Sequence, residues 1–407
     1  MEQKYRAPSS FFQYLIAIVA ACLVFGIMQG TKDNYGIMMN GIIQHTNISY
    51  AAVSFAIGVG QILYGVTQPL FAMIALKKSN TFVLLCGIIL MASGLIVTPF
   101  CTREWSMFLF FGIVLPTGTG ALCLGVVMGA ISPIVGEKKA AAASGIIQAS
   151  AGIGDALMAP MLQHLTAWRG ITVSMPIFSI PILLMLPVIA WLSGREKCNK
   201  RQSIQASNTE VVLQTESLFR ILCGAAHDRT YWCLLIGFST CGFHMSIIET
   251  HLFSQYLSSG IPANLTSFAL TVYGITTMIG AVATGFLGQR FKTKNVLASV
   301  YGIRIIIAVA FTVLPKSIPF AFIATAALGL TGDSTVPPTT GIISQKVGIA
   351  KMAVLYGSLC IGHQIGAFFS AWMGGILVGT SLSYTSLWIA DLALSSIASF
   401  ASFSIKE

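Results

Sequence analysis

Two adjacent charged residues, Lys32 and Asp33, lie in the run GTKDNYG at 30–36, near the end of the first apolar stretch of the chain. A charged side chain at the centre of a bilayer costs at least about 2.5–3.5 kcal/mol, so it persists mostly where it lines a water-filled cavity or meets a partner. In such a cavity Lys32 would present a cation to a carboxylate, and Asp33 would bind a proton or hold Lys32 in place. The alternative is that Lys32 extends to the outer headgroups of the bilayer and Asp33 caps it.

Three further acidic residues lie within apolar stretches and are candidates for binding a coupled proton. Asp155 directly follows the glycine-rich run at 152–154, and a low dielectric disfavours its ionised form. Asp333 lies shortly before a Pro-Pro pair, which breaks a helix and frees polar backbone groups of the kind that line cavities. Glu249 lies about two turns from the outer end of its stretch. The alternative for Asp155 is a structural hydrogen bond, and the alternative for Glu249 is contact with water.

Histidines in two apolar stretches can relay protons, and a cationic histidine can bind an anion. His244 and His251 are seven residues apart and therefore share one face of a helix. His363 is followed by Gln364 in a glycine-containing run. The alternative for His244 and for His251 is a hydrogen bond between helices that serves the fold alone. The alternative for His363 is a polar pair with Gln364 that packs helices together among glycines.

The composition indicates an all-α protein with many membrane-spanning helices. Hydrophobic residues make up 55% of the 407 residues and charged residues only 9%, whereas soluble domains contain about 25% charged residues. The nine cysteines stand singly, without a C-x-x-C pair, so we expect neither a disulfide framework nor a metal site. The sequence shows no P-loop, zinc-protease or nucleophile-elbow pattern. We therefore expect neither an enzyme nor an ATP-driven pump, and no cofactor.

We predict twelve membrane-spanning helices, with both termini in the cytoplasm. The predicted spans are 12–40, 51–74, 81–100, 107–131, 141–164, 173–193, 231–255, 265–288, 296–314, 318–342, 352–378 and 384–403. Most of the 23 lysines and arginines then fall in cytoplasmic segments, as the positive-inside rule requires, and Arg103, Arg169 and Lys316 fall in outer loops. The formal net charge of +10 therefore reflects membrane topology and not the binding of nucleic acid.

The longest polar stretch, 194–230, divides the chain into two halves of six spans each. The first half covers 1–193 and the second half covers 231–407. The end of this linker, Ser217–Ala226, is apolar enough to form a short helix on the inner membrane surface.

Arg304 and Asp391 are predicted to form a buried ion pair in the second half. They lie in the ninth and twelfth spans, which we expect to be neighbours on the outer edge of that half. Removal of one partner from such a pair typically lowers the stability of the protein by about 3–5 kcal/mol.

A repeat and four short motifs resemble the major facilitator superfamily over essentially the whole chain. The pattern IS-x-x-VG-x-x-K at 131–139 recurs at 343–351, as expected for parallel repeats of six spans. Within the superfamily, the motifs are similar to those of bacterial monocarboxylate porters and oxalate/formate antiporters. They are GTKDNYG at 30–36, CGFH at 241–244 with His251, STVP at 334–337 and GHQIGAF at 362–368.

The resemblance implies a major facilitator fold that works by alternating access, with two pseudo-symmetric six-helix halves. It implies transport of a small organic anion, such as a monocarboxylate, by proton symport or anion exchange. The predicted substrate contacts are Lys32, where the resembling proteins carry Arg, together with Tyr35, His244 and His363. The predicted proton-coupling residues are the four acids Asp33, Asp155, Asp333 and Glu249.

The alternative function is a proton-driven exporter of cationic or zwitterionic compounds. It is motivated by the acidic residues, which outnumber the basic ones among the candidates for a central cavity. In either case the expected partners are a small-molecule substrate, protons and the lipid bilayer, with no nucleic acid. We expect a monomer in the cytoplasmic membrane of a bacterium.

Overall fold

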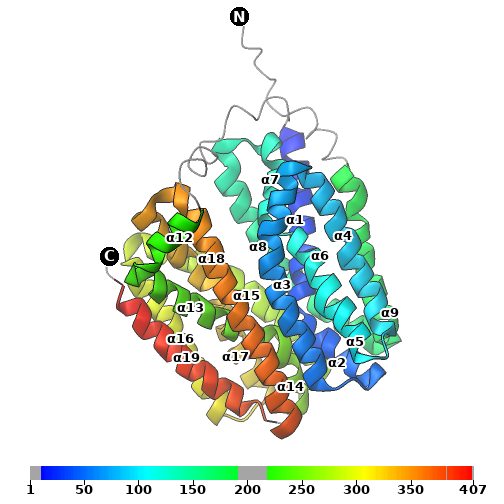
Figure 1. Cartoon of the computed structure of the whole chain (residues 1–407). Coiled ribbons are helices and arrows are strands. Elements are labelled where there is room, and N and C mark those ends of the chain that lie inside the picture. Colours follow the sequence, from blue (N-terminus) through cyan, green and yellow to red (C-terminus); the bar gives the residue numbers. More distant parts are fainter. Residues whose placement is uncertain (1–10, 191–217, 382, 406–407) are drawn as a thin grey trace, which may run out of the picture.

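The computed structural model describes residues 11–190, 218–381 and 383–405, and every regular element within those residues is a helix. The predicted linker at 194–230 lies outside the described residues as far as 217. In Figure 1 the first half of the chain, blue to green, lies beside the second half, green to red. We name the two ends of the molecule after their helices: the α12 end is uppermost in Figure 1 and the α5 end is lowermost.

The first half contains two breaks that the predicted spans do not show. Asn34 interrupts the first predicted span, so that α1 ends at Asp33 and α2 begins at Tyr35. The fourth predicted span consists of several short helices, one of them the π-helix η2. The bounds are α1 (Phe11–Asp33), α2 (Tyr35–Thr46), α3 (Tyr50–Lys77), α4 (Asn80–Val97), η1 (Thr98–Phe100), α5 (Glu104–Met107), η2 (Phe108–Val114), α6 (Leu115–Ala121), α7 (Leu124–Val135), α8 (Glu137–Arg169) and α9 (Ile171–Leu183).

The second half begins with a short helix, α12, which confirms the helix predicted at the end of the linker. The segment between the tenth and eleventh predicted spans is helical too, so α18 contains the end of one span and all of the next. The bounds are α12 (Leu218–Ala226), α13 (Arg229–Ser246), η4 (Ile247–Leu252), α14 (Phe253–Ser258), α15 (Ala263–Arg290), α16 (Thr293–Val313), α17 (Ile318–Thr331), η5 (Asp333–Thr335), α18 (Val336–Ser381) and α19 (Thr385–Phe403).

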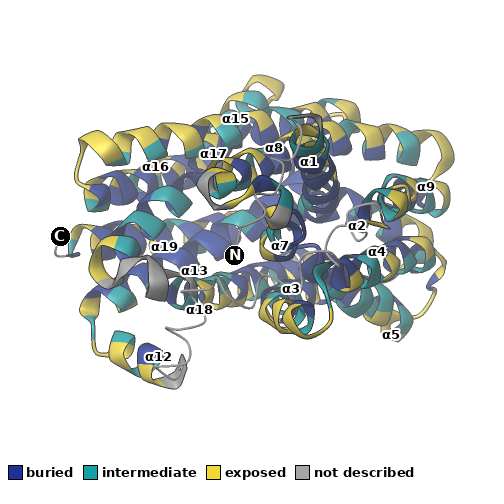
Figure 2. Ribbon diagram, turned by 90° about the horizontal axis from the view of Figure 1, so that it is seen from above, coloured by how far each residue is buried: buried dark blue, intermediate teal, exposed yellow. Residues whose placement is uncertain are grey.

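Ten helical stretches of the described chain are long and apolar enough to cross a membrane, and they match ten of the twelve predicted spans. The other two predicted spans are 141–164 and 318–342. The first lies inside α8, a 33-residue helix rich in alanine and glycine. The second is divided at Gly332, where the 14-residue helix α17 ends and η5 begins. The exposed residues lie mainly along the outward faces of the bundle (Figure 2). Many of them are large and apolar, as contact with lipid requires.

Glycines bring three long helices into close contact. Within the first half α1 packs on α8, and the two halves meet where α8 packs on α15 and α3 packs on α18. A Cβ atom added at Gly30 would lie only 2.5 Å from the backbone of Gly154, so α1 and α8 touch through their backbones. Gly152 and Gly274 make the same kind of contact between α8 and α15. Small residues at such crossings allow the close packing on which helix association in lipid depends.

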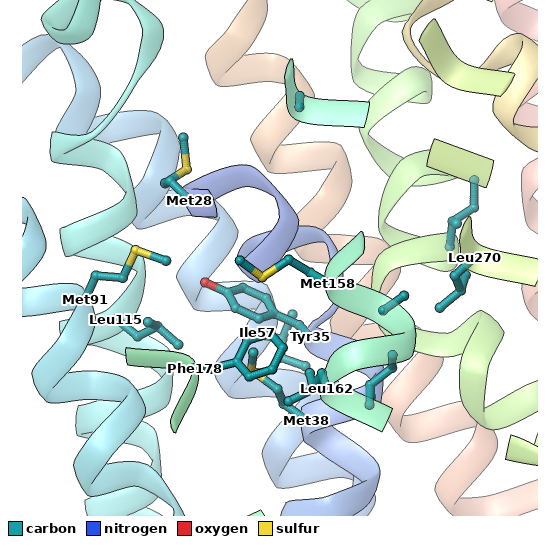
Figure 3. Close-up of a cluster of buried hydrophobic side chains, with 14 of the residues drawn as sticks. Met28, Tyr35, Met38, Ile57, Met91, Leu115, Met158, Leu162, Phe178 and Leu270 are labelled. Atoms are coloured by element: carbon teal, nitrogen blue, oxygen red, sulfur yellow. The ribbon is translucent and has the colours of Figure 1, made fainter. Parts of the chain in front are cut away.

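A continuous apolar core fills the first half and reaches the second. Met28, Tyr35, Met91 and Leu115 are buried in it, and Leu270 of α15 belongs to the same cluster (Figure 3). Because lipid is as apolar as these side chains, close packing stabilises the bundle more than removal from water does. This core fixes the positions of α1 and α2, which carry the first charged motif.

The substitution Gly154→Val is expected to lower the stability of the protein, because the new side chain would push α1 away from α8. Overpacking of this kind costs about 1–3 kcal/mol. Thermal unfolding of the purified protein in detergent measures the loss. Gly145→Val in the same helix is the matched control, because a Cβ added at Gly145 meets no atom within 4 Å. Equal losses in the two variants would contradict the proposed role of the contact.

Candidate functional site

Lys32 lies in the last turn of α1 and is buried between the two halves, with only 5% of its surface exposed. Its Nζ donates to Asp33 Oδ1 at 2.8 Å and to both carboxylate oxygens of Glu249 at 3.1 Å. The ring of Tyr64 lies 5.3 Å from Nζ and adds a cation–π contact. The ammonium group therefore has its partners inside the protein, which argues against the alternative that Lys32 extends to the headgroups.

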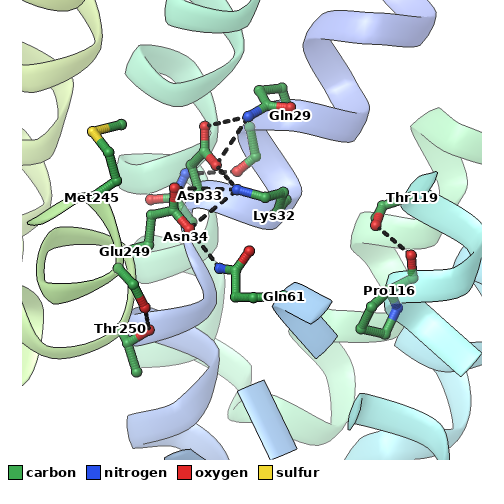
Figure 4. A network of polar contacts seen from close by, with 12 residues as sticks. Gln29, Lys32, Asp33, Asn34, Gln61, Pro116, Thr119, Met245, Glu249 and Thr250 are labelled. Atoms are coloured by element: carbon green, nitrogen blue, oxygen red, sulfur yellow. Dashed lines mark hydrogen bonds and ion pairs between the residues drawn. The ribbon is translucent and has the colours of Figure 1, made fainter. Parts of the chain in front are cut away.

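Glu249 reaches Lys32 from the second half of the chain, on the π-helix η4 that follows α13. A π-helical turn contains one extra residue and frequently occurs at functional sites. Glu249 is buried, and its Oε2 also accepts a 2.8 Å hydrogen bond from Gln61 Nε2 on α3. Figure 4 shows Lys32, Asp33, Glu249 and Gln61 converging from α1, η4 and α3. The alternative that Glu249 faces water is wrong.

Asp33 and Asp155 bring two carboxyl groups together in the first half. Gln29 Nε2 donates to both oxygens of Asp33, at 3.2 and 3.0 Å. Asp155 directly follows Gly154 on α8, so the close packing of Gly30 on Gly154 places Asp155 beside the end of α1 that carries Asp33. Ionised carboxylates only accept hydrogen bonds, so a bond between these two groups needs a proton on one of them.

The other predicted site residues lie around this network, and none of their described contacts is with Lys32. Asp333 lies in η5, directly after the break that ends α17. His363 is half-buried on α18. Tyr35 packs edge-on against Phe111, with ring centroids 5.3 Å apart, in the apolar core of the first half. Tyr35 therefore contributes to packing rather than to a contact with the ammonium group.

His244 is not part of the network around Lys32, contrary to the prediction. Its Nδ1 lies 2.8 Å from Oδ2 of Asp391 on α19, and both side chains are fully buried inside the second half. The indole of Trp388 packs against the histidine, with ring centroids 6.3 Å apart. His244 thus belongs to a polar pair within one half and not to the interface between the halves.

The predicted ion pair between Arg304 and Asp391 is also wrong. Arg304 Nη2 donates to the backbone carbonyls of Thr331 at 2.6 Å and of Gly332 at 2.9 Å. These carbonyls lie at the end of α17, where a helix leaves its last acceptors without internal partners. The guanidinium group therefore binds the broken helix, while His244 is the hydrogen-bonding partner of Asp391.

Two glutamines and a tyrosine complete the site and were missed by the sequence analysis. Gln61 and Gln29 orient the carboxylates of Glu249 and Asp33, and Tyr64 provides the ring beside Lys32. The sequence gives a weak indication that both glutamines are buried, since each lies within an apolar stretch. A buried amide needs hydrogen-bond partners as a buried charge does.

The arrangement joins one cation to an excess of acidic groups. Lys32 contacts two carboxylates directly, and Asp155 and Asp333 lie nearby, so complete ionisation would place four negative charges against one positive charge. An uncompensated buried charge is costly, and protonation relieves it. The described residues contain no cluster of three or more histidine, cysteine or acidic side chains suited to a metal.

Comparison with known proteins identifies relatives along most of the chain. The family model described as Major Facilitator Superfamily matches residues 14–259. Monocarboxylate transporter 12 of Rattus norvegicus is 23% identical over 345 residues, which cover 79% of this chain and 70% of that protein. Monocarboxylate transporter 13 of the same species is 22% identical, over 94% of this chain and 83% of that protein.

Solved structures match the fold across nearly the whole chain. The nucleoside transporter NupG superposes with a TM-score of 0.75 at 14% identity, covering 97% of this chain and 99% of that one. A bacterial homologue of the lysosomal transporter Spinster, in an inward-facing and unoccupied conformation, gives a TM-score of 0.73 at 15% identity, covering 96% of each chain. At these identities the likeness shows the fold alone, and it confirms the predicted fold class.

The substitution Asp391→Asn is expected to destabilise the second half, because it weakens the buried hydrogen bond between His244 Nδ1 and Asp391 Oδ2. A hydrogen bond to a charged group contributes about 1.5–3 kcal/mol and one between neutral groups about 0.5–1.5 kcal/mol, whereas breaking an exposed ion pair costs about 0–1 kcal/mol. Thermal unfolding in detergent compares Asp391→Asn with Asp228→Asn. Asp228 pairs with Lys346 at 2.9 Å where both side chains are partly exposed. A smaller loss in Asp391→Asn than in Asp228→Asn would rule out a stabilising role for the buried pair.

Proposed function

Because this chain belongs to the major facilitator superfamily of membrane transporters, we propose that it carries a small monocarboxylate-like anion across the membrane by alternating access. Membership identifies a secondary transporter and not an enzyme. In the proposal, the halves 1–193 and 231–407 rock about a central site while both termini remain in the cytoplasm. The α12 end then faces the cytoplasm and the α5 end faces the outside.

The observation that carries this proposal is the buried ammonium group of Lys32 between the halves, bound by carboxylates from both of them. A cation in this position can bind a carboxylate that arrives from outside the protein. Lysine is a compact point charge, so it binds a carboxylate with less geometric demand than the planar fork of arginine. The monocarboxylate transporters among the relatives support the same substrate class.

Proton coupling follows from the charge of the site in this proposal. An anion that enters beside Asp33 and Glu249 is repelled unless one of the acids takes up a proton. Uptake of one anion with one proton leaves the net charge of the site unchanged. The proposed proton acceptors are Asp33, Asp155, Glu249 and Asp333. In a variant of this cycle, one anion is exchanged for another and no net proton moves.

The substitution Lys32→Ala is expected to abolish the uptake of formate, acetate, L-lactate and pyruvate into proteoliposomes. Lys32→Arg is expected to retain part of the uptake, because the positive charge stays in place. Lys292→Ala is the control, since Lys292 is exposed in the connection between α15 and α16. Uptake is measured with radiolabelled acids. Unchanged uptake in Lys32→Ala would contradict the proposed role of Lys32 in binding the anion.

The alternative, a proton-driven exporter of cationic or zwitterionic compounds, is favoured by one observation. The acids around Lys32 outnumber it, so an ionised site would be negative and would attract cations. Cells that express the chain separate the two functions. Accumulation of labelled L-lactate supports the anion transporter, whereas resistance to a cationic dye without lactate uptake supports the exporter.

A further inference from the structure

The carboxylate of Glu249 is held in the way that a bound substrate carboxylate would be held. Lys32 Nζ lies 3.1 Å from each of its two oxygens, and Gln61 Nε2 donates to Oε2 at 2.8 Å. One ammonium group and one amide therefore bind it together, and all three side chains are buried. An entering carboxylate that binds Lys32 would therefore compete with Glu249 for its donors.

Glu249 also joins the two halves, since Lys32 and Gln61 lie in the first half and η4 lies in the second. The neighbouring contacts on the α5 side continue this connection. Asn40 Nδ2 donates to Ser254 Oγ at 2.6 Å, and the hydroxyl of Tyr50 lies 2.7 Å from Nδ1 of His251. The second-half partners therefore all lie on η4 and α14, which form one continuous segment.

On the α5 side of Lys32, a Cβ atom added at Gly36 of α2 would lie 2.9 Å from the backbone oxygen of Thr250 in η4. The halves are thus in backbone contact on the α5 side, in the segment that holds Glu249.

We propose that Glu249 is a tethered carboxylate that occupies the substrate position on Lys32 and holds the α5 end closed while no anion is bound. This inference rests on the proposed transport of an anion. When the anion arrives, the contact between Lys32 and Glu249 breaks, one proton from the solvent binds the carboxylate of Glu249, and the contact between Lys32 and the anion forms. The released η4 no longer ties the two halves together, so the α5 end can open.

The charges balance in this exchange. Glu249 loses one negative charge as it takes the proton, and the anion brings one negative charge in its place. The contact of Lys32 with Asp33, 2.8 Å in this structure, is not changed by the exchange in this proposal. The other titratable groups close enough to interact with the charge of Glu249 are Asp33, Tyr35, Tyr273 and His363.

The substitution Glu249→Gln tests the competition directly, because it removes the competing charge and leaves Lys32 paired with Asp33. Binding of formate, acetate, L-lactate and pyruvate is measured by calorimetry at several pH values. In the unmodified chain, affinity is expected to rise as the pH falls, by up to about tenfold per pH unit, because one proton binds with each anion. In Glu249→Gln the affinity is expected to be roughly tenfold higher at neutral pH and independent of pH.

Glu104→Gln is the matched control, since it makes the same change at an exposed acid on α5. It is expected to bind the acids as the unmodified chain does. A pH dependence that persists in Glu249→Gln, or an affinity that falls, would overturn the proposal, because another group would then take the proton.

Hydrogen–deuterium exchange tests the connection between the halves without any substrate. Amides of α2 and α14 are expected to exchange at least about threefold faster in Glu249→Gln than in Glu104→Gln, because the α5 end opens more often. Equal exchange in the two variants would overturn the role of Glu249 in closing that end. If none of the four acids binds the unmodified chain, the proposed substrate class is wrong, and the exchange measurement still decides whether Glu249 joins the halves.

Discussion

The positive charge of Lys32, withdrawn from water at the interface of the two halves, is the constraint on which the central structure depends. A buried charge requires a partner and hydrogen bonds, and Lys32 finds them in Asp33 beside it and in Glu249 across the interface. Each carboxylate also accepts a hydrogen bond from a glutamine, Asp33 from Gln29 and Glu249 from Gln61. The need to satisfy one ammonium group thus sets the positions of side chains on three elements, α1, α3 and η4.

The second half contains a separate polar cluster that the central charge does not touch. His244 and Asp391 form a pair between α13 and α19, and Arg304 binds the carbonyls at the end of α17. All of these groups move together when the half moves as a body. The contacts of Glu249 with Lys32 and Gln61, in contrast, cross from one half to the other, and the proposed cycle of alternating access would break them. The two clusters therefore differ in the demands that transport places on them.

The fold class and the burial of Lys32 inside the protein could be predicted from the sequence, because hydropathy and a charge in an apolar stretch are local signals. The pairing of Arg304 with Asp391 was predicted incorrectly, because the competing acceptors are backbone carbonyls that only the break after α17 exposes. The partner of Lys32 was not identified as Glu249, since the contact spans the two halves and depends on a π-helical turn. The role of Gln61 depends on that same contact, so it could not be predicted from the sequence either.

The π-helix η4 has a consequence for the length of the chain in this region. One extra residue in a turn rotates the helix that follows by about 100° relative to the helix before it. Glu249 lies inside this turn, and Ser254 and Gln255 follow it on α14, where Ser254 binds Asn40 and Gln255 accepts a hydrogen bond from Trp388. Removal of a single residue from Ile247–Leu252 would turn α14 away from both partners at once. The number of residues in this turn is therefore as strictly constrained as the identity of the acid that it carries.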